Sequence, residues 1–218
     1  MKHVVKGFAP ESFERWKTEG DELWEPSYSQ LQNPEKQALH KVLLTEQGGV
    51  CCYCGREVSL NDSHIEHFRP QHHFEELQLS FQNLHASCLR EAKPGLPLHC
   101  GHAKKDDFDE DSIIDPQDPS CERRFIYTEL GAIEAADPAD ERAMYMTKLL
   151  SLDIPFLQAA RAEALKKALG AEFMSEATAE ELRILRDAFR RPDSDGRLSS
   201  LGHVIARYAE QYLPPDEA

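Results

Sequence analysis

Two adjacent residues, Glu66 and His67, carry the kinds of side chain that hydrolysis of a phosphodiester bond requires. A carboxylate can hold a hard divalent cation that stabilises the charge developing on phosphate, and an imidazole can take a proton from water at neutral pH. On a strand, neighbouring side chains point to opposite sides of the backbone, so one group can hold the ion while the other faces the water. The pair therefore indicates a metal-dependent hydrolytic site.

Two further polar residues could complete this site from other parts of the chain. Asn83 could fix the orientation of the His67 ring through a hydrogen bond. His102 falls in the first turn of a short helix expected to begin near Gly101, from which its imidazole could return to the same ion as Glu66. We therefore expect these side chains to lie close together in space.

Several other histidines and an arginine are weaker candidates. His64 would share one face of a strand with Glu66, so it is either a group that orients the site or a substitute metal ligand. Arg69 could contact phosphate or form a surface salt bridge, and the sequence favours neither role. The remaining histidines of this region are predicted to be incidental: His72, His73, His85 and His99.

Four cysteines surround these residues in the sequence. Cys51 and Cys54 form a C-x-x-C pair followed by Gly55, and such a turn lets two thiolates face one metal ion. Cys88 and Cys100 could supply the other two ligands. A closed, four-cysteine site of this kind binds zinc for structure and not for catalysis.

Other interpretations of the cysteines are a redox pair or buried apolar thiols. A redox C-x-x-C pair leads directly into a helix of a βαβ unit, and no such pattern follows Cys54. Cys88 and Cys100 could instead be buried as apolar side chains. Cys52 is expected to point away from the ion, and Cys121 is expected to lie outside the site.

The apolar and turn-forming residues indicate which elements position these groups. Residues 9–48 are expected to be helical, with Pro10 and Pro34 at helix starts. The central part is expected to form short strands and loops, including a strand or hairpin over 125–133. The last part is expected to consist of helices over residues 139–152, 155–169, 177–191 and 199–213.

These elements predict an α+β fold that is mainly α. The small central part would carry the cysteines and the hydrolytic groups, and helices would flank it on both sides. The chain is accordingly divided into an N-terminal helical segment, a central core and a C-terminal helical region, which are residues 1–48, 49–134 and 135–218.

Composition limits the setting in which such a site would work. No run of about 18 apolar residues occurs, so no segment is expected to span a membrane, and the start of the chain lacks the pattern of a secretory signal. The cytoplasm is the expected compartment. The net charge of -14 is unusual for a protein that grips nucleic acid unaided. Either a local basic groove lies within the acidic whole, or a partner holds the nucleic acid.

The order of these motifs resembles that of the HNH nuclease superfamily with a zinc-containing ββα-metal core. The resemblance implies that His67 is the general base, that Asn83 steadies it, and that Glu66 and His102 hold a catalytic Mg²⁺ or Mn²⁺ ion. The chain departs from the family pattern in four places: Glu66 replaces the commoner Asp, Pro70 comes one residue later, residues 89–99 split the second cysteine pair, and Gly101 precedes the last histidine.

The chain is more specifically similar to PtuB, the HNH subunit of Septu-type anti-phage systems, which is also found beside some retrons. The similarity lies in two segments, HIEHFRP and CGHAK, and in the helical C-terminal half. This resemblance implies a partner ATPase of the ABC/SMC-like kind, docked on the helical flanks, and a DNA substrate, with RNA as the alternative. It would explain the acidity of the chain.

Three other functions stay open from the sequence. The chain could be a stand-alone HNH nuclease, or a zinc-stabilised interaction module without catalysis. It could also be a zinc hydrolase that uses His64, His67 and a carboxylate, which predicts a second tightly bound zinc ion.

Overall fold

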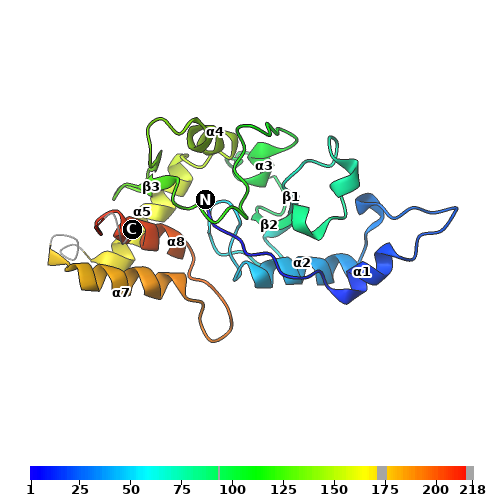
Figure 1. Ribbon diagram of the computed structural model, residues 1–218, viewed down its shortest axis with the longest axis horizontal. Coiled ribbons are helices and arrows are strands. Elements are labelled where there is room, and N and C mark those ends of the chain that lie inside the picture. Colours follow the sequence, from blue (N-terminus) through cyan, green and yellow to red (C-terminus); the bar gives the residue numbers. More distant parts are fainter. Residues whose placement is uncertain (93, 171–175, 215–218) are drawn as a thin grey trace.

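The computed structural model describes residues 1–92, 94–170 and 176–214. The molecule is elongated, with the N-terminal helices and a β-hairpin toward one end and the C-terminal helices toward the other (Figure 1). The described elements are mainly helical, with two small antiparallel sheets of two strands each. Within these ranges, no helix combines the length and the apolar character needed to cross a bilayer.

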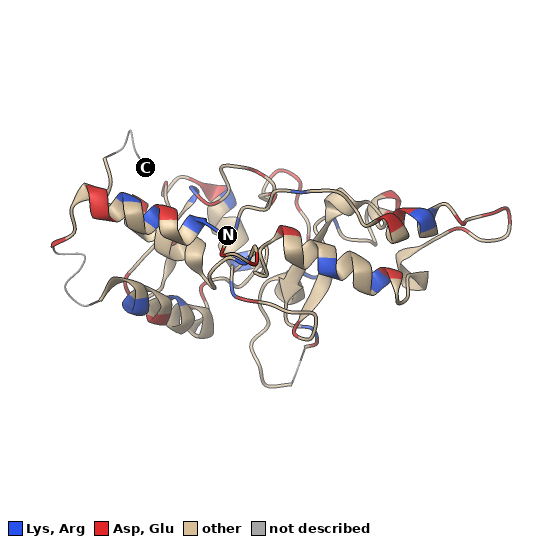
Figure 2. Ribbon diagram, turned by 90° about the horizontal axis from the view of Figure 1, so that it is seen from below, with Lys and Arg blue, Asp and Glu red and all other residues tan. Residues whose placement is uncertain are grey.

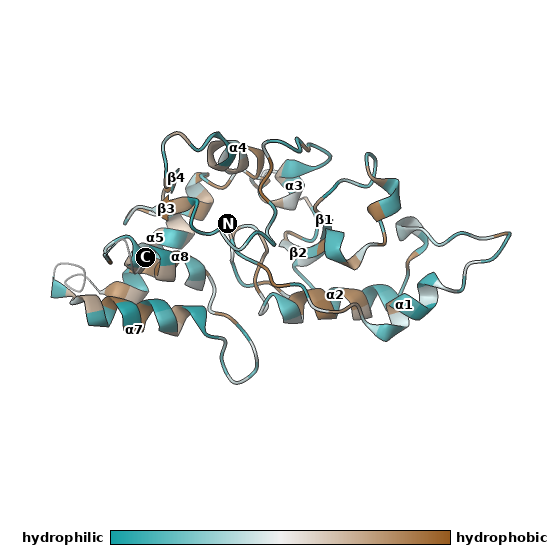
Figure 3. Ribbon diagram, in the orientation of Figure 1, coloured by the Kyte–Doolittle hydropathy of each residue, from teal (hydrophilic) through white to brown (hydrophobic). Residues whose placement is uncertain are grey.

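Two N-terminal helices, α1 (Glu11–Lys17) and α2 (Glu35–Glu46), confirm the helix starts predicted near Pro10 and Pro34, but residues 9–48 are not helical throughout. A long loop with a 3₁₀ turn at Tyr28–Gln30 separates them. The buried apolar stripe of α2 packs against the hairpin, and Figure 3 shows hydrophobic residues on this helix beside hydrophilic ones. The helix ends before Gly48, whose φ of 64° is a left-handed conformation that glycine adopts without strain.

The hairpin consists of β1 (Ser63–His67) and β2 (Leu84–Cys88), with Glu66 opposite His85 and His67 opposite Leu84. The alternation of side chains along β1 gives its two faces different neighbours. Ile65 and His67 face the N-terminal helices and their loop. His64 and Glu66 face the short helix α3 (Gly101–Lys104), which follows the hairpin in the chain.

The predicted hairpin after residue 124 is confirmed as β3 (Phe125–Tyr127) and β4 (Ile133–Ala135). The predicted C-terminal helices are confirmed. The helix α5 (Pro155–Leu169) has the predicted bounds, and the other three are shorter than predicted: α4 (Glu141–Leu149), α7 (Ala179–Arg190) and α8 (Gly202–Glu210). Side-chain caps set two of the starts, because Asp140 and Thr178 accept hydrogen bonds from the first turns of α4 and α7.

The cysteines and the C-terminal helices share one hydrophobic core. Cys51, Cys100, Leu165 and Val204 belong to the same cluster of buried residues, so the central part and the C-terminal region pack as one body. The N-terminal helices form a second cluster with the hairpin. The division into three domains stays a prediction.

Candidate functional site

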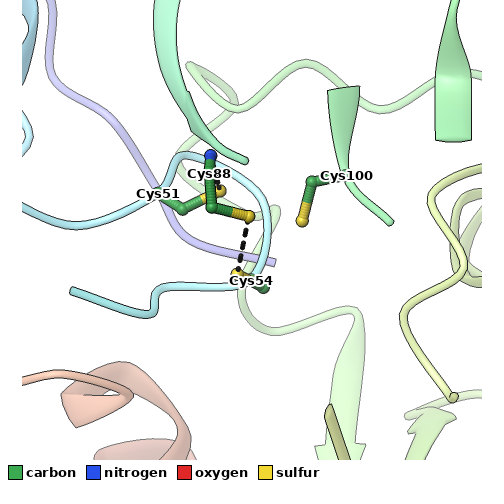
Figure 4. A group of neighbouring side chains, drawn as sticks. All are labelled: Cys51, Cys54, Cys88 and Cys100. Atoms are coloured by element: carbon green, nitrogen blue, oxygen red, sulfur yellow. Dashed lines mark hydrogen bonds between the residues drawn. The ribbon is translucent and has the colours of Figure 1, made fainter. Parts of the chain in front are cut away.

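The four predicted cysteines meet in the core, although they come from separate segments (Figure 4). All four are buried, and their sulfur atoms lie within 4.8 Å of one another. Zinc–sulfur bonds of about 2.3 Å in a tetrahedron place the sulfur atoms roughly 3.8 Å apart. The Sγ atoms of Cys54 and Cys88 are 3.7 Å apart, close to that edge. The donor set and its spacing therefore fit a zinc ion, which these residues could hold.

Local backbone geometry brings the first cysteine pair around one point. Gly55 has a φ of 70°, and a Cβ atom there would lie 2.2 Å from the ring of His203. Glycine is therefore needed both for the turn and for the close approach of that ring. The backbone N–H of Cys88 donates to Cys51 Sγ over 3.4 Å, as Figure 4 shows. Burial opposes a thiolate at Cys51, but hydrogen bonds from the neighbouring thiols hold its pKa well below the ordinary value.

His99 lies against the cysteine cluster, although the sequence indicated an incidental residue. Its Nδ1 is 3.5 Å from Cys88 Sγ and 3.3 Å from Cys100 Sγ, and the residue is fully buried. A ring nitrogen outside the tetrahedron can donate to a metal-bound thiolate and orient it. The signal in the sequence was its position directly before Cys100.

Glu66 is a buried carboxylate with three protein partners. Its Oε1 accepts a hydrogen bond from the Tyr53 hydroxyl over 3.1 Å and lies 3.1 Å from Lys104 Nζ. Its Oε2 lies 3.3 Å from His64 Nε2. Burial disfavours the charged form, but the hydrogen bond from His64 and the charge of Lys104 outweigh it and lower the pKa of Glu66. The site therefore holds a negative charge in its interior.

Lys104 was not expected in this site, since lysine is ordinarily exposed. Its ammonium is buried and also donates to the carbonyl oxygen of His67 over 3.1 Å. The buried ammonium compensates the negative charge of the Glu66 carboxylate. The sequence contained only an indirect signal, the position of Lys104 two residues after His102 in the predicted short helix.

Replacing Lys104 with methionine is expected to lower the free energy of unfolding by about 3–5 kcal/mol, because Glu66 would keep a buried charge without its ammonium partner. Urea unfolding followed by circular dichroism measures the change. The exposed neighbour Lys105 provides the matched control, and Lys105→Met is expected to change the free energy by less than about 0.5 kcal/mol. Equal losses in the two variants would contradict the structural role of Lys104.

His64 lies beside Glu66 on the face of the hairpin toward α3, and His102 of α3 packs on His64. Their ring centroids are 4.6 Å apart, and His64 Nδ1 and His102 Nε2 lie 2.7 Å and 2.8 Å from the carbonyl oxygen of Leu89. Gly101 permits this packing, because a Cβ atom there would lie 2.3 Å from Glu66 Oε2. These groups lie farther apart than the cysteines. Among the described residues, only the four cysteines bring three or more possible ligand atoms within 4.8 Å of one another.

His67 lies on the opposite face of β1, as expected from its place next to Glu66. Its Nε2 is 3.0 Å from the carbonyl oxygen of Gln78, and its Nδ1 is 3.3 Å from the side-chain nitrogen of Gln71. A carbonyl oxygen only accepts, so Nε2 carries the proton and Nδ1 keeps a lone pair. Burial lowers the pKa of His67 and favours the neutral ring. This ring is perpendicular to that of Tyr28, with 4.4 Å between the centroids.

Asn83 is close to His67 in the fold but forms its hydrogen bonds with backbone atoms. Its Oδ1 accepts from the Arg69 N–H over 2.7 Å, and its Nδ2 donates to the carbonyl oxygens of Arg69 and Leu77 over 3.0 Å and 3.2 Å. The amide thus fastens the loop that ends at Gln78, whose carbonyl orients His67. Asn83 therefore acts on His67 through this loop, and its hydrogen bonds do not include the predicted one to the ring.

Arg69 is engaged by protein groups. Its guanidinium lies 3.1 Å from Glu110 Oε1 and within 6 Å of the ring centroids of Phe68, Phe74 and Phe108. Of the two roles considered for Arg69, the described contacts correspond to the salt bridge.

A relative of this chain is found among known proteins. No family model matches the chain. The relative is a predicted HNH endonuclease of retron Vc95 from Vibrio cholerae serotype O1 biovar El Tor. The two are 26% identical over 139 residues, which are 61% of this chain and 65% of the relative. The match thus spans just under two thirds of the relative's length. Over this stretch the chain is similar to a protein named as an HNH endonuclease.

Proposed function

We propose that the chain is a metal-dependent endonuclease of the HNH type that hydrolyses phosphodiester bonds, with DNA as the substrate and RNA as the alternative. The main support comes from the short strand β1. It carries the ionised Glu66 on one face and the neutral, oriented His67 on the other. The cysteine cluster at the end of β2 would hold a structural zinc ion that fixes the hairpin.

The α3 face supplies the ligands in this proposal. Glu66 and His102 would hold Mg²⁺ or Mn²⁺, and His64, which touches Glu66 Oε2, would be a further ligand or an orienting group. Such an ion, when bound, stabilises negative charge on the phosphate and on the leaving oxygen. Lys104 would keep Glu66 ionised and in place.

His67 would accept the proton of the attacking water at Nδ1. The Gln78 carbonyl holds the other ring nitrogen, and Asn83 fixes the loop that carries Gln78. The Gln71 amide lies 3.3 Å from Nδ1. Gln71 would therefore have to release this nitrogen when the substrate enters.

Replacing Glu66 with glutamine tests this function, since the amide keeps the shape of the carboxylate and removes its charge. With zinc-loaded protein, plasmid DNA and added Mg²⁺ or Mn²⁺, cleavage is expected to fall by about 100-fold or more. Glu110→Gln, at an exposed carboxylate outside the site, is the control and should cut as the original chain does. Absence of cleavage by the original chain with either ion would indicate a non-catalytic zinc module instead.

The proposal extends to a role in anti-phage defence with an ABC/SMC-like ATPase subunit. It is supported by the resemblance to the HNH subunit of Septu-type systems, by the retron named in the relative, and by the net charge of -14. A partner would then hold much of the nucleic acid. Co-expression with an ABC/SMC-like ATPase, if one is encoded beside this chain, and size-exclusion chromatography would test the complex. Separate elution of the two proteins would contradict it.

A further inference from the structure

A polar groove runs between α2 and the edge of β1 that has no strand beside it in the described sheet. Its volume is about 490 Å³. Amide, imidazole and cationic side chains line it, and none of its lining residues is an aspartate or glutamate. The chain has 39 acidic residues against 25 basic ones, and the acidic residues occur at both ends of the molecule (Figure 2). A lining without a carboxylate therefore sets this groove apart from the acidic character of the chain.

The two cations of the groove, Lys36 and Arg90, have no carboxylate partner among the described residues. Lys36 Nζ lies 4.7 Å from the centroid of the Tyr28 ring, and Arg90 donates to the carbonyl oxygen of Leu60 over 3.0 Å. Both charges are therefore available to an anion. Burial, together with the positive charges of His64, Arg90 and Lys36, lowers the pKa of His40 in the groove to about 4. Burial is the main cause of this shift, and the neighbouring cations add to it.

The groove leads to both halves of the candidate hydrolytic site. His64 lines it and also touches Glu66 Oε2. Tyr28 lines it and packs on the ring of His67. A chain of phosphates lying along the free edge of β1 would therefore reach the carboxylate on one face and the imidazole on the other.

We propose that the groove between α2 and β1 binds the sugar–phosphate backbone of a nucleic-acid strand, with Lys36 and Arg90 contacting phosphates. Side-chain amides of the groove, such as Asn33 and Asn61, would hydrogen-bond to the same strand. The inference names the substrate path of the proposed nuclease and rests on that function for its role, but strand binding itself is measured without cleavage.

The double variant Lys36→Gln with Arg90→Gln tests the groove. A short fluorescein-labelled single-stranded oligodeoxynucleotide is titrated with the full, zinc-loaded chain, without Mg²⁺ or Mn²⁺, and anisotropy is read at several salt concentrations. Loss of two phosphate contacts is expected to weaken binding about 25-fold at roughly 0.1 M salt and to reduce the slope of log K against log salt by about 1.4.

Lys41→Gln is the matched control, because Lys41 is exposed on α2 and does not line the groove. It should retain nearly the original affinity. Equal binding by the double variant and the original chain, an equal loss in Lys41→Gln, or no binding by the original chain would each overturn the inference.

The outcomes also separate the groove from the chemistry. If the double variant loses DNA affinity while Glu66→Gln still cuts DNA, the groove stands and the catalytic assignment fails. If Glu66→Gln is inactive and the double variant binds as before, the nuclease stands and the groove assignment fails.

Discussion

Changing His67 to alanine is expected to slow DNA cleavage by about 10²–10⁴-fold, the usual contribution of a general base. The ring is neutral because burial lowers its pKa. Its Nδ1 keeps the lone pair that can take a proton, because Nε2 donates to the Gln78 carbonyl. The variant loses this group without touching the cysteines. Cleavage is measured as the rate of nicking of supercoiled plasmid in saturating Mg²⁺ or Mn²⁺.

The controls for this variant separate chemistry from folding. Zinc content, measured by atomic emission, should equal that of the original chain, because His67 lies on the face of β1 away from α3. His73→Ala, at an exposed histidine of the following loop, should cut at the original rate. Full cleavage by His67→Ala would remove His67 from the mechanism.

Changing Cys54 to serine is expected to release the zinc and unfold the core that the cysteines share with the C-terminal helices. Structural zinc sites contribute apparent free energies of about 10–16 kcal/mol, which exceeds the whole stability of most domains. Thermal unfolding and zinc content measure the effect, and the variant should lack both a cooperative transition and the metal.

Cys121→Ser is the matched control, because Cys121 is equally buried but its thiol points to the Pro116 carbonyl oxygen, outside the cluster. It should keep its zinc and a cooperative transition. A Cys54→Ser variant with full zinc and unchanged unfolding would contradict the assignment of Cys54 as a zinc ligand.

The sequence by itself determined the local features. Helix starts at Pro155 and α2, the glycine turn after the first cysteine pair, and the hairpin after residue 124 follow from short-range rules of capping and turn formation. The alternation of side chains along a strand likewise predicted that Glu66 and His67 face opposite sides of the backbone. Such features depend on residues a few positions apart, which the sequence displays directly.

The tertiary structure decided everything that joins distant segments. Cys88 and Cys100 meet across residues 89–99 because β2 and the start of α3 return to one point. Lys104 is buried only because the hairpin brings Glu66 to it, and Asn83 finds backbone partners in a loop instead of the His67 ring. The sequence indicated the four cysteines as a set, but burial and long-range contacts depend on the packed fold. Spacing along the chain could therefore not reveal the burial of Lys104, the backbone partners of Asn83 or the polar groove.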